Sequence, residues 1–427
     1  MNNKKLIGII VAAIGLVLIV VGCILTPNNN KVKKTPEIKE FTINGEFVTK
    51  MGDSLLVSDG EKYGYYDING KKVLDLKYAF DWDNYFDRID AKDGMFVVTD
   101  NGVEYGIVDA SEKVIISNSY SAIKIISKNC FLVRDDNLSW SVVDAKNKKI
   151  IDKTYDSVTV VNNIGAILTK DNKNDIIDVN GNKISKSEYT YVVDYDDSNA
   201  NNPILIGQIG NDKNDLFIFT SDKYKIIESV GSNYFINDNY LYYSSDGTNF
   251  SSYEFKTGKI KNKVTVDFSV NGMNMFVGKN GLLGYKSVDE KTVIKEQYQL
   301  SISNEFTKYG VAVVGKDDLQ GVINNKGDTI LPCKYKKILV FSDKLFAVRD
   351  GEDSLYYLVD EKGTKIYEKV DFDSTINNEI IVYDGEKCGV IDNYNKKIFD
   401  VKYESCSVYT GMVAVREGSN WLIRKGK

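Results

Sequence analysis

A short phrase recurs along most of this 427-residue chain: an aromatic residue, a glycine, two apolar residues and an aspartate that opens a turn. In seven copies a tyrosine follows at an interval of 11 positions from the aspartate or the residue in its place. A repeat of about 35–40 residues is too small to bury a core alone, so neighbouring copies must stack on one another. The positions that define the repeat are Tyr63, Gly64, Asp67, Tyr78, Gly106, Asp109, Tyr120, Trp140, Asp144, Tyr155, Asp178, Tyr189, Gly284, Tyr298, Gly321, Tyr335, Asp360, Gly389, Asp392, Tyr403 and Trp421.

The chemistry within one copy predicts an all-β fold. In the copy that runs from 120 to 151, we expect strands at 121–126, 130–133, 140–143 and 149–151, separated by Asn, Asp and Ser turns. The chain holds only 4 prolines, as expected where most backbone N–H groups lie in strand ladders. Four short antiparallel strands per copy predict β-propeller-like blades. An open β-solenoid array is the alternative.

The repeat also predicts how the chain is divided. If the array closes into a ring, its first and last strands should pair, and residues 41–43 and 412–415 are suitable for this. The copies weaken between residues 190 and 280, so we count about ten units in all. The predicted segments are 1–25 as a membrane anchor or signal, 26–40 as a polar linker and 41–427 as the repeat domain.

These residues resemble the bacterial WG-repeat family, also called the WG β-repeat, and the resemblance covers about residues 41 to 426. The family phrase is typically Trp-Gly, then Ile-Asp, a Gly-Lys turn and a Tyr-Asp pair. Here Trp140 keeps the tryptophan, Tyr63 and Tyr105 replace it, and the pair stands at Tyr155-Asp156. The resemblance implies a β-repeat scaffold, often membrane-anchored or secreted, with no activity common to all members.

The N-terminus carries a separate signal. An uncharged apolar run from Leu6 to Leu25 follows Lys4 and Lys5. Its 20 residues suit the about 20 that a helix needs to cross a bilayer, and it lacks the polar face of a core helix. We expect one transmembrane helix in the cell membrane, with the bulk of the chain outside the cytoplasm. Residues of this anchor are Leu6, Ile9, Ile10, Leu16, Leu18 and Val21.

Two alternatives stay open for this segment. The run Val20-Val21-Gly22-Cys23 resembles a lipobox, which would make Cys23 the lipidated residue of a lipoprotein. A cleaved secretory signal is the other alternative, although no A-x-A cleavage site is visible. All three fates place most of the chain on the same, outer side of the membrane.

Composition excludes several classes of function. The chain has no histidine, which excludes Ser-His-Asp triads, Cys-His dyads and His-containing metal sites. Its net charge of -5 gives no electrostatic reason to bind nucleic acid. No Cys-x-x-Cys pair exists, and the spacing of the cysteines pairs none of them as disulfides. We therefore predict no catalytic residues, no metal and no cofactor. The cysteines are Cys23, Cys130, Cys333, Cys388 and Cys406, of which Cys130 and Cys388 fall at packing positions.

The repeated polar residues have simple structural interpretations. Each repeated aspartate precedes a short turn, where its carboxylate should accept backbone N–H groups. The repeated tyrosines should pack between units with their hydroxyls bonded, or else form an aromatic strip that stacks on glycans or a partner chain. An acidic run is expected to form solvated loops. It consists of Asp81, Asp83, Asp87, Asp90 and Asp93.

Three functions remain, from different classes. The first is a non-catalytic, membrane-anchored extracytoplasmic scaffold that binds a protein partner through its loops. The second is a module that binds cell-wall glycan or teichoic acid. The third is a carboxylate-dependent hydrolase, which would need two carboxylates facing each other across a cleft. The scaffold is the preferred prediction because the residue types that catalysis needs are scarce or already required by turns.

Overall fold

The computed structural model describes residues 39–425 of the chain, apart from short gaps. The expected membrane anchor, the residue Cys23 and most of the linker therefore lie outside the described residues. Within the described part, no helix is long and apolar enough to span a membrane. The short helix α2 (Tyr85–Arg88) stands among strands. The gaps are at 82, 84, 162–163, 187, 196–203, 210–212, 220–223, 231–232, 238–239, 245–248, 265–271, 280, 300–304 and 377.

The described residues form eleven small antiparallel sheets, which we number in chain order. This confirms the all-β repeat fold. Sheets 1 and 2 contain β2 (Phe47–Met51), β3 (Ser54–Ser58), β4 (Lys62–Asp67) and β5 (Lys72–Ala79), then β6 (Ala91–Lys92), β7 (Met95–Val98), β8 (Tyr105–Asp109) and β9 (Val114–Tyr120). Sheets 3 and 4 contain β10 (Ala122–Ser127), β11 (Cys130–Arg134) and β12 (Trp140–Val143), then β13 (Ser157–Val161), β14 (Gly165–Lys170) and β15 (Lys173–Asp178).

The remaining sheets continue the same pattern to the end of the described chain. Sheets 5 to 7 contain β16 (Tyr191–Tyr195), β17 (Ile204–Ile209), β18 (Lys213–Phe219) and β19 (Tyr224–Val230); β20 (Asn233–Asn237), β21 (Tyr240–Ser244), β22 (Phe250–Glu254) and β23 (Ile260–Val264); and β24 (Met273–Val277), β25 (Leu283–Ser287) and β26 (Val293–Tyr298). Sheets 8 and 9 contain β27 (Val311–Lys316), β28 (Leu319–Asn324) and β29 (Thr329–Tyr335), then β30 (Lys337–Val340), β31 (Leu345–Arg349), β32 (Tyr357–Asp360) and β33 (Lys365–Tyr367). Sheets 10 and 11 contain β34 (Lys369–Ile376), β35 (Glu379–Asp384), β36 (Lys387–Asp392) and β37 (Lys397–Tyr403), then β38 (Ser405–Tyr409), β39 (Met412–Glu417), β40 (Asn420–Lys425) and β1 (Glu40–Asn44).

In sheets 1, 2 and 10 the repeated phrase lies on the third strand, and its glycine lets the fourth strand approach closely. A Cβ added at Gly64 in β4 would lie 2.6 Å from backbone atoms of Asp75 in β5, and one at Gly106 would lie 2.5 Å from the carbonyl oxygen of Ile116 in β9. Real Cβ atoms do not come that close, so these positions require glycine. At Gly284, Gly321 and Gly389 the same distance to the outer strand is 2.7 Å.

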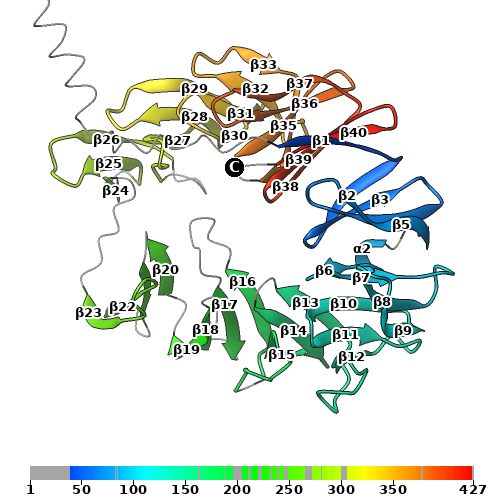
Figure 1. Ribbon diagram of the computed structural model, residues 1–427. Helices are drawn as coiled ribbons and strands as arrows, with labels where there is room; N and C mark the ends of the chain where they lie inside the picture. The colour runs from blue at the N-terminus through cyan, green and yellow to red at the C-terminus, as the bar shows by residue number, and fades with distance from the viewer. Residues whose placement is uncertain are drawn as a thin grey trace, which may run out of the picture.

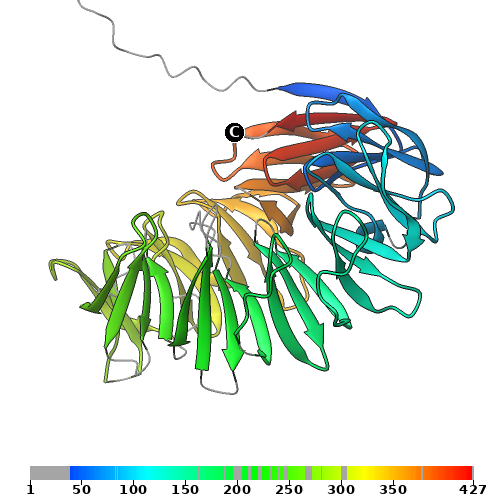
Figure 2. The same ribbon diagram turned by 60° about the horizontal axis from the view of Figure 1, so that its bottom comes forward.

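Apolar faces of neighbouring sheets pack against one another. For example, Leu132 and Val142 of sheet 3 pack with Ala166 and Leu168 of sheet 4. Clusters of this kind join sheets 7 to 11 in succession, sheet 11 to sheet 1, and sheets 1 to 6 in succession. The buried core is therefore divided among the spaces between sheets, as stacking of units requires. Figure 2 shows the successive sheets standing side by side around an arc.

The first described strand completes the last sheet. Strand β1 pairs antiparallel with β40, so that Ile43 lies opposite Trp421, and Figure 1 shows the N-terminal and C-terminal sheets side by side. The expected pairing of residues 41–43 is thus present, but the expected partner at 412–415 is wrong. Those residues form β39, one strand further in. The reason is the strand order of sheet 11. A fourth strand pairs with the third strand of its sheet, and the third strand here is β40.

The copy used as an example forms three of its four expected strands, namely β10, β11 and β12. Its fourth segment is held by two isolated bridges, Val143 with Lys149 and Trp140 with Tyr155. These bridges keep the register of the other units, since Tyr63–Tyr78 with Tyr66–Lys72 in sheet 1 and Tyr105–Tyr120 with Val108–Val114 in sheet 2 pair in the same way. In the weak region between 190 and 280, sheets 5 and 6 supply the copies that the phrase marks only faintly.

Candidate functional site

The repeated aspartates hold their own turns. Asp144 accepts hydrogen bonds from the backbone N–H groups of Lys146 and Lys148, both at 2.9 Å. These bonds favour the charged carboxylate and hold the pKa of Asp144 below its ordinary value. The same pattern, with donors two and four positions later, recurs at Asp67, Asp109, Asp178, Asp360 and Asp392.

The residue after each repeated tyrosine ties one sheet to the next. The N–H of Asp156, which follows Tyr155, donates to the carbonyl oxygen of Thr169 at 2.8 Å. This bond holds the connection between two sheets beside the end of the second strand of the later sheet. The turns that join second to third strands therefore lie at the same edge of the successive sheets. We call that edge the rim. The seven donor–acceptor pairs are Ala79–Thr99, Ser121–Arg134, Asp156–Thr169, Thr190–Gln208, Gln299–Gly315, Lys336–Arg349 and Glu404–Arg416, at 2.8–2.9 Å.

The tyrosines themselves lie between sheets. Tyr155 is 1% exposed, and its hydroxyl donates to Asp175 Oδ2 in sheet 4 at 3.2 Å. Tyr120 is half-buried and bonds Asn147 in the next unit. An exposed aromatic strip is therefore wrong, because the hydroxyls and rings are used in packing. The other repeated tyrosines, Tyr78, Tyr189, Tyr298, Tyr335 and Tyr403, are each at most 8% exposed.

Sheet 9 departs from the 11-residue interval because its fourth strand is short. Tyr367 in β33 is 7% exposed and belongs to the core between sheets 9 and 10, where it takes the place of the expected tyrosine. The two tryptophans of the phrase carry an arginine over their rings. Arg134 lies 5.5 Å from the ring centre of Trp140, and Arg416 lies 5.8 Å from that of Trp421.

The first strands of five consecutive sheets line a cavity of about 510 Å³, which we call the inner cavity. Figure 1 shows the first strands β2, β6 and β38 nearer the middle of the molecule than the fourth strands β5, β9 and β37. Lys50 from β2, Lys92 from β6 and Lys124 from β10 line the inner cavity together with Asp90. Val158 and Val160 of β13, Ile89 and Tyr409 contribute apolar surface.

Asp90 organises one wall of the inner cavity. Its carboxylate accepts the N–H groups of Ala91 and Ile125, both at 2.8 Å, and so ties β6 to β10. Burial raises the pKa of Asp90, against these two bonds and the positive charge of Lys124. Burial likewise lowers the pKa of Lys124, against the charge of Asp90. The expectation that Asp90 lies in a solvated loop is wrong, because its carboxylate is needed between two inner strands.

A close backbone contact fixes the relative position of sheets 1 and 2 at this wall. Gly52, in the turn after β2, has a φ of 58°, and a Cβ added there would lie 1.7 Å from the carbonyl oxygen of Ala91. On the other side, the Lys50 ammonium donates to the carbonyl oxygen of Thr410 at 2.7 Å. Around the inner cavity, sheet 1 thus meets sheet 2 through a close backbone contact and sheet 11 through a hydrogen bond.

Residues 321–352 match the family model described as WG containing repeat. The match begins at Gly321 of the phrase and includes Tyr335, so it agrees in register with the repeat found in sheets 8 and 9. The chain therefore contains a WG repeat at these residues.

Solved structures similar to this WG-repeat protein were found, and no relative was found among the curated proteins. BamB from Moraxella catarrhalis is 10% identical, with 91% of this chain and 99% of that chain covered and a TM-score of 0.26. PorZ of the type-IX secretion system of Porphyromonas gingivalis is 9% identical, covering 89% and 73%, with a TM-score of 0.25. The computationally designed Ika8 protein is 10% identical, covering 80% and 96%, with a TM-score of 0.24.

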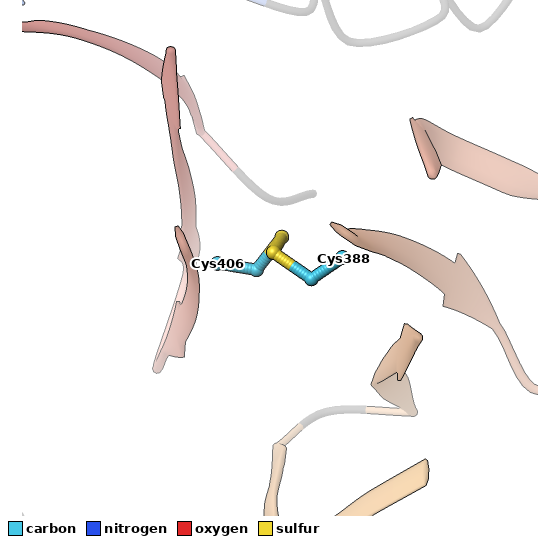
Figure 3. Close-up of a disulfide and its surroundings, with 2 residues drawn as sticks. All are labelled: Cys388 and Cys406. Atoms are coloured by element: carbon cyan, nitrogen blue, oxygen red, sulfur yellow. A yellow bond between two sulfur atoms is a disulfide. The ribbon is translucent and has the colours of Figure 1, made fainter. Parts of the chain in front are cut away.

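The WG-repeat protein also contains a disulfide that sequence spacing did not identify. Cys388 of β36 is bonded to Cys406 of β38, which joins sheet 10 to sheet 11, and Figure 3 shows the bond crossing between the two sheets. The register of the repeat contains the missing signal. Cys388 takes the position of Tyr63, whose hydroxyl reaches Val97 in the next sheet, so a residue at this position faces the neighbouring unit.

The other described cysteines of the WG-repeat protein, Cys130 and Cys333, are free thiols. Cys130 is fully buried, which agrees with its expected packing position, and burial raises the pKa of its thiol to about 12. Such a thiol is a poor nucleophile at neutral pH. Among the described residues, no three His, Cys, Asp or Glu side chains are placed to hold a metal ion.

Proposed function

We propose that this WG-repeat protein is a non-catalytic, propeller-like scaffold that binds a protein partner outside the cytoplasm while its N-terminal segment anchors it to the membrane. The observation that carries the proposal is the use of the repeated polar groups. Asp144 and Asp178 each accept two backbone N–H groups of their own turns, and Tyr155 and Asp175 bond each other between sheets. The repeat thus uses its polar side chains to stabilise the fold, and its variable turns remain available to bind a partner.

The rim offers a surface for a protein partner. Three of its turns carry an apolar residue that the fold leaves exposed: Val103 at 63%, Leu138 at 64% and Leu355 at 69%. Val103 and Leu138 belong to neighbouring sheets, 2 and 3, whose turns lie at the same edge. Exposed apolar side chains that stand together are a usual component of protein-binding surfaces. We therefore propose that the partner contacts the turns of sheets 2 and 3.

The disulfide supports the extracytoplasmic placement. Structural disulfides form and persist in oxidising surroundings outside the cytoplasm and are rare inside it. Cys388 and Cys406 are 6.1 Å apart at their Cα atoms, within the range that a disulfide spans. Labelling of accessible thiols in intact cells, before and after reduction, tests this part of the proposal.

Crosslinking in intact cells tests the partner. A photoreactive amino acid at Leu138 should give a discrete adduct with one protein, and Val103→Asp should reduce that adduct at least about tenfold by weakening apolar contact. The matched control is Val293→Asp, which adds the same charge at a 53% exposed position on the outer strand β26 of sheet 7, away from the rim. The proposal fails if no specific adduct forms, or if the control variant reduces it equally.

A further inference from the structure

The inner cavity concentrates positive charge in a protein whose net charge is -5. Lys50, Lys92 and Lys124 come from the first strands of three neighbouring sheets and line one space with a single aspartate, Asp90. The lining therefore carries an excess of positive charge, opposite in sign to the whole chain. Since nothing in the repeat demands a lysine at these three positions, the concentration is a feature of this cavity and not of the scaffold.

The three ammonium groups differ in how far the protein already satisfies them. Lys50 donates to the carbonyl oxygen of Thr410, and Lys124 lies close enough to Asp90 for each charge to act on the other. Lys92 is half-buried and makes no side-chain hydrogen bond or ion pair with the residues that the structure describes. A half-buried ammonium beside a cavity retains donor capacity, because each lysine has three N–H donors.

The size and the remaining lining restrict what could enter. A volume of about 510 Å³ lies within the range of about 300–1,000 Å³ that is usual for small-molecule sites. It is larger than a phosphate ion alone needs, and Val158, Val160 and Ile89 add apolar surface beside the charged groups. A ligand with a compact anionic end and a short organic body fits both parts of this lining.

We propose that the inner cavity binds a phosphate-bearing ligand, with the phosphate held by Lys92 and Lys124 and the organic body against β13. Lysine ammonium groups are compact point charges and are used widely for phosphate. A phosphate monoester carries about two negative charges at neutral pH, which matches the excess of lysine over Asp90. The partly buried position strengthens each of these attractions relative to bulk water.

Calorimetric titration of the full-length protein with glycerol 3-phosphate tests the proposal. Lys92→Gln should weaken binding about tenfold, equivalent to about 1.4 kcal/mol, whereas Lys92→Arg should retain most of the affinity because it keeps the charge. Lys146→Gln removes an exposed lysine that does not line the cavity and should leave binding unchanged. Binding should also weaken as salt is raised.

Two further titrations identify the source of the phosphate. Inorganic phosphate tests the free ion, and a short poly(glycerol phosphate) tests a polymer chain; tighter binding by either one than by the monoester assigns the site to that source. Neutral glycerol is the control for the organic body. The proposal is overturned if no phosphate compound binds at millimolar concentration, if glycerol binds as well as its phosphate, or if Lys92→Gln and Lys124→Gln, both checked for folding by thermal melting, bind normally.

The cavity and the rim are tested independently. The crosslinking experiment at Leu138 does not involve the inner cavity, and the titrations do not need a protein partner. A negative result in one experiment therefore does not change the conclusion drawn from the other.

Discussion

The hydroxyl of Tyr189 donates a 2.8 Å hydrogen bond to Asp215 Oδ2, which lies in the next sheet. Tyr155 and Asp175 are related in the same way one unit earlier. Both carboxylates stand where other units have the glycine of the phrase, and both are at most 4% exposed. In sheets 4 and 5 a tyrosine–aspartate pair between units thus replaces the close contact that Gly64 and Gly106 allow in sheets 1 and 2.

Removal of the Tyr189 hydroxyl should destabilise the protein. In Tyr189→Phe the buried carboxylate of Asp215 loses a donor, and loss of a partner for a buried polar group costs about 1–3 kcal/mol. Urea unfolding of the two proteins measures the difference. Tyr394→Phe is the control, because Tyr394 is 60% exposed. Equal stability of Tyr189→Phe and the parent protein would show that the hydrogen bond contributes nothing.

Much of the architecture could be predicted from the repeat. The interval from an aspartate to the later tyrosine, as from Asp144 to Tyr155, predicts a turn and a fourth segment in each unit. The aspartate side chain holds that turn through bonds to residues of the turn itself. Residues 41–43 could be recognised as a closing strand because they are apolar and precede the first copy. The turns and fourth segments depend on neighbours within about 40 residues, which a repeat makes visible.

The inner cavity and the disulfide could not be predicted in the same way. Lys50, Lys92 and Lys124 each look like a solvated lysine on a short strand, and only the curvature of the stack brings them to one space. Cys388 and Cys406 are in different sheets, so their proximity depends on how sheet 10 packs on sheet 11. The role of Asp90 could not be predicted either, because the sequence does not show that its carboxylate accepts the N–H of Ile125 in the next unit.

Asp175 should make stability depend on pH in the acid range. Burial opposes its ionisation, but hydrogen bonds from Lys183 and Tyr155 and the charges of Lys183 and Lys153 outweigh burial and hold the pKa of Asp175 below its ordinary value of 3.8. The folded state therefore binds this proton less readily than the unfolded chain does. The resulting stability is complete above pH 3.8 and is lost as the pH falls through the lower, folded pKa.

Asp175→Asn tests this linkage. The variant should be less stable at pH 7, because Lys183 loses its 2.7 Å ion pair, and its stability should fall less steeply below about pH 4. Thermal melts at a series of pH values measure both effects. Asp152→Asn, at an exposed aspartate, should keep the parental pH profile. A profile for Asp175→Asn parallel to that of the parent down to pH 2 would contradict the assignment.

Removal of the disulfide should lower stability without changing the fold. The bond closes a loop with a sequence separation of 18 residues, and a loop of about this length is worth about 3 kcal/mol in the chain-entropy account. The double variant Cys388→Ala/Cys406→Ala should unfold at a lower urea concentration. Reducing agent should lower the stability of the parent protein and leave the double variant unchanged. A further loss in the reduced double variant would point to another reducible bond.

Strand β1 should contribute more to stability than its five residues suggest, because it completes sheet 11 and joins it to sheet 1. Ile43 is 3% exposed and packs with Val48, Leu55 and Trp421. Truncation of such a side chain leaves a cavity and costs about 2–5 kcal/mol, so Ile43→Ala should lower the free energy of unfolding by about that amount. Thr42→Ala changes the adjacent, exposed side of the same strand and should have little effect. Hydrogen exchange then gives the decisive measurement: in Ile43→Ala, amides of β40 should lose protection while those of sheet 4 keep it, and uniform loss across the chain would contradict a local closing role for β1.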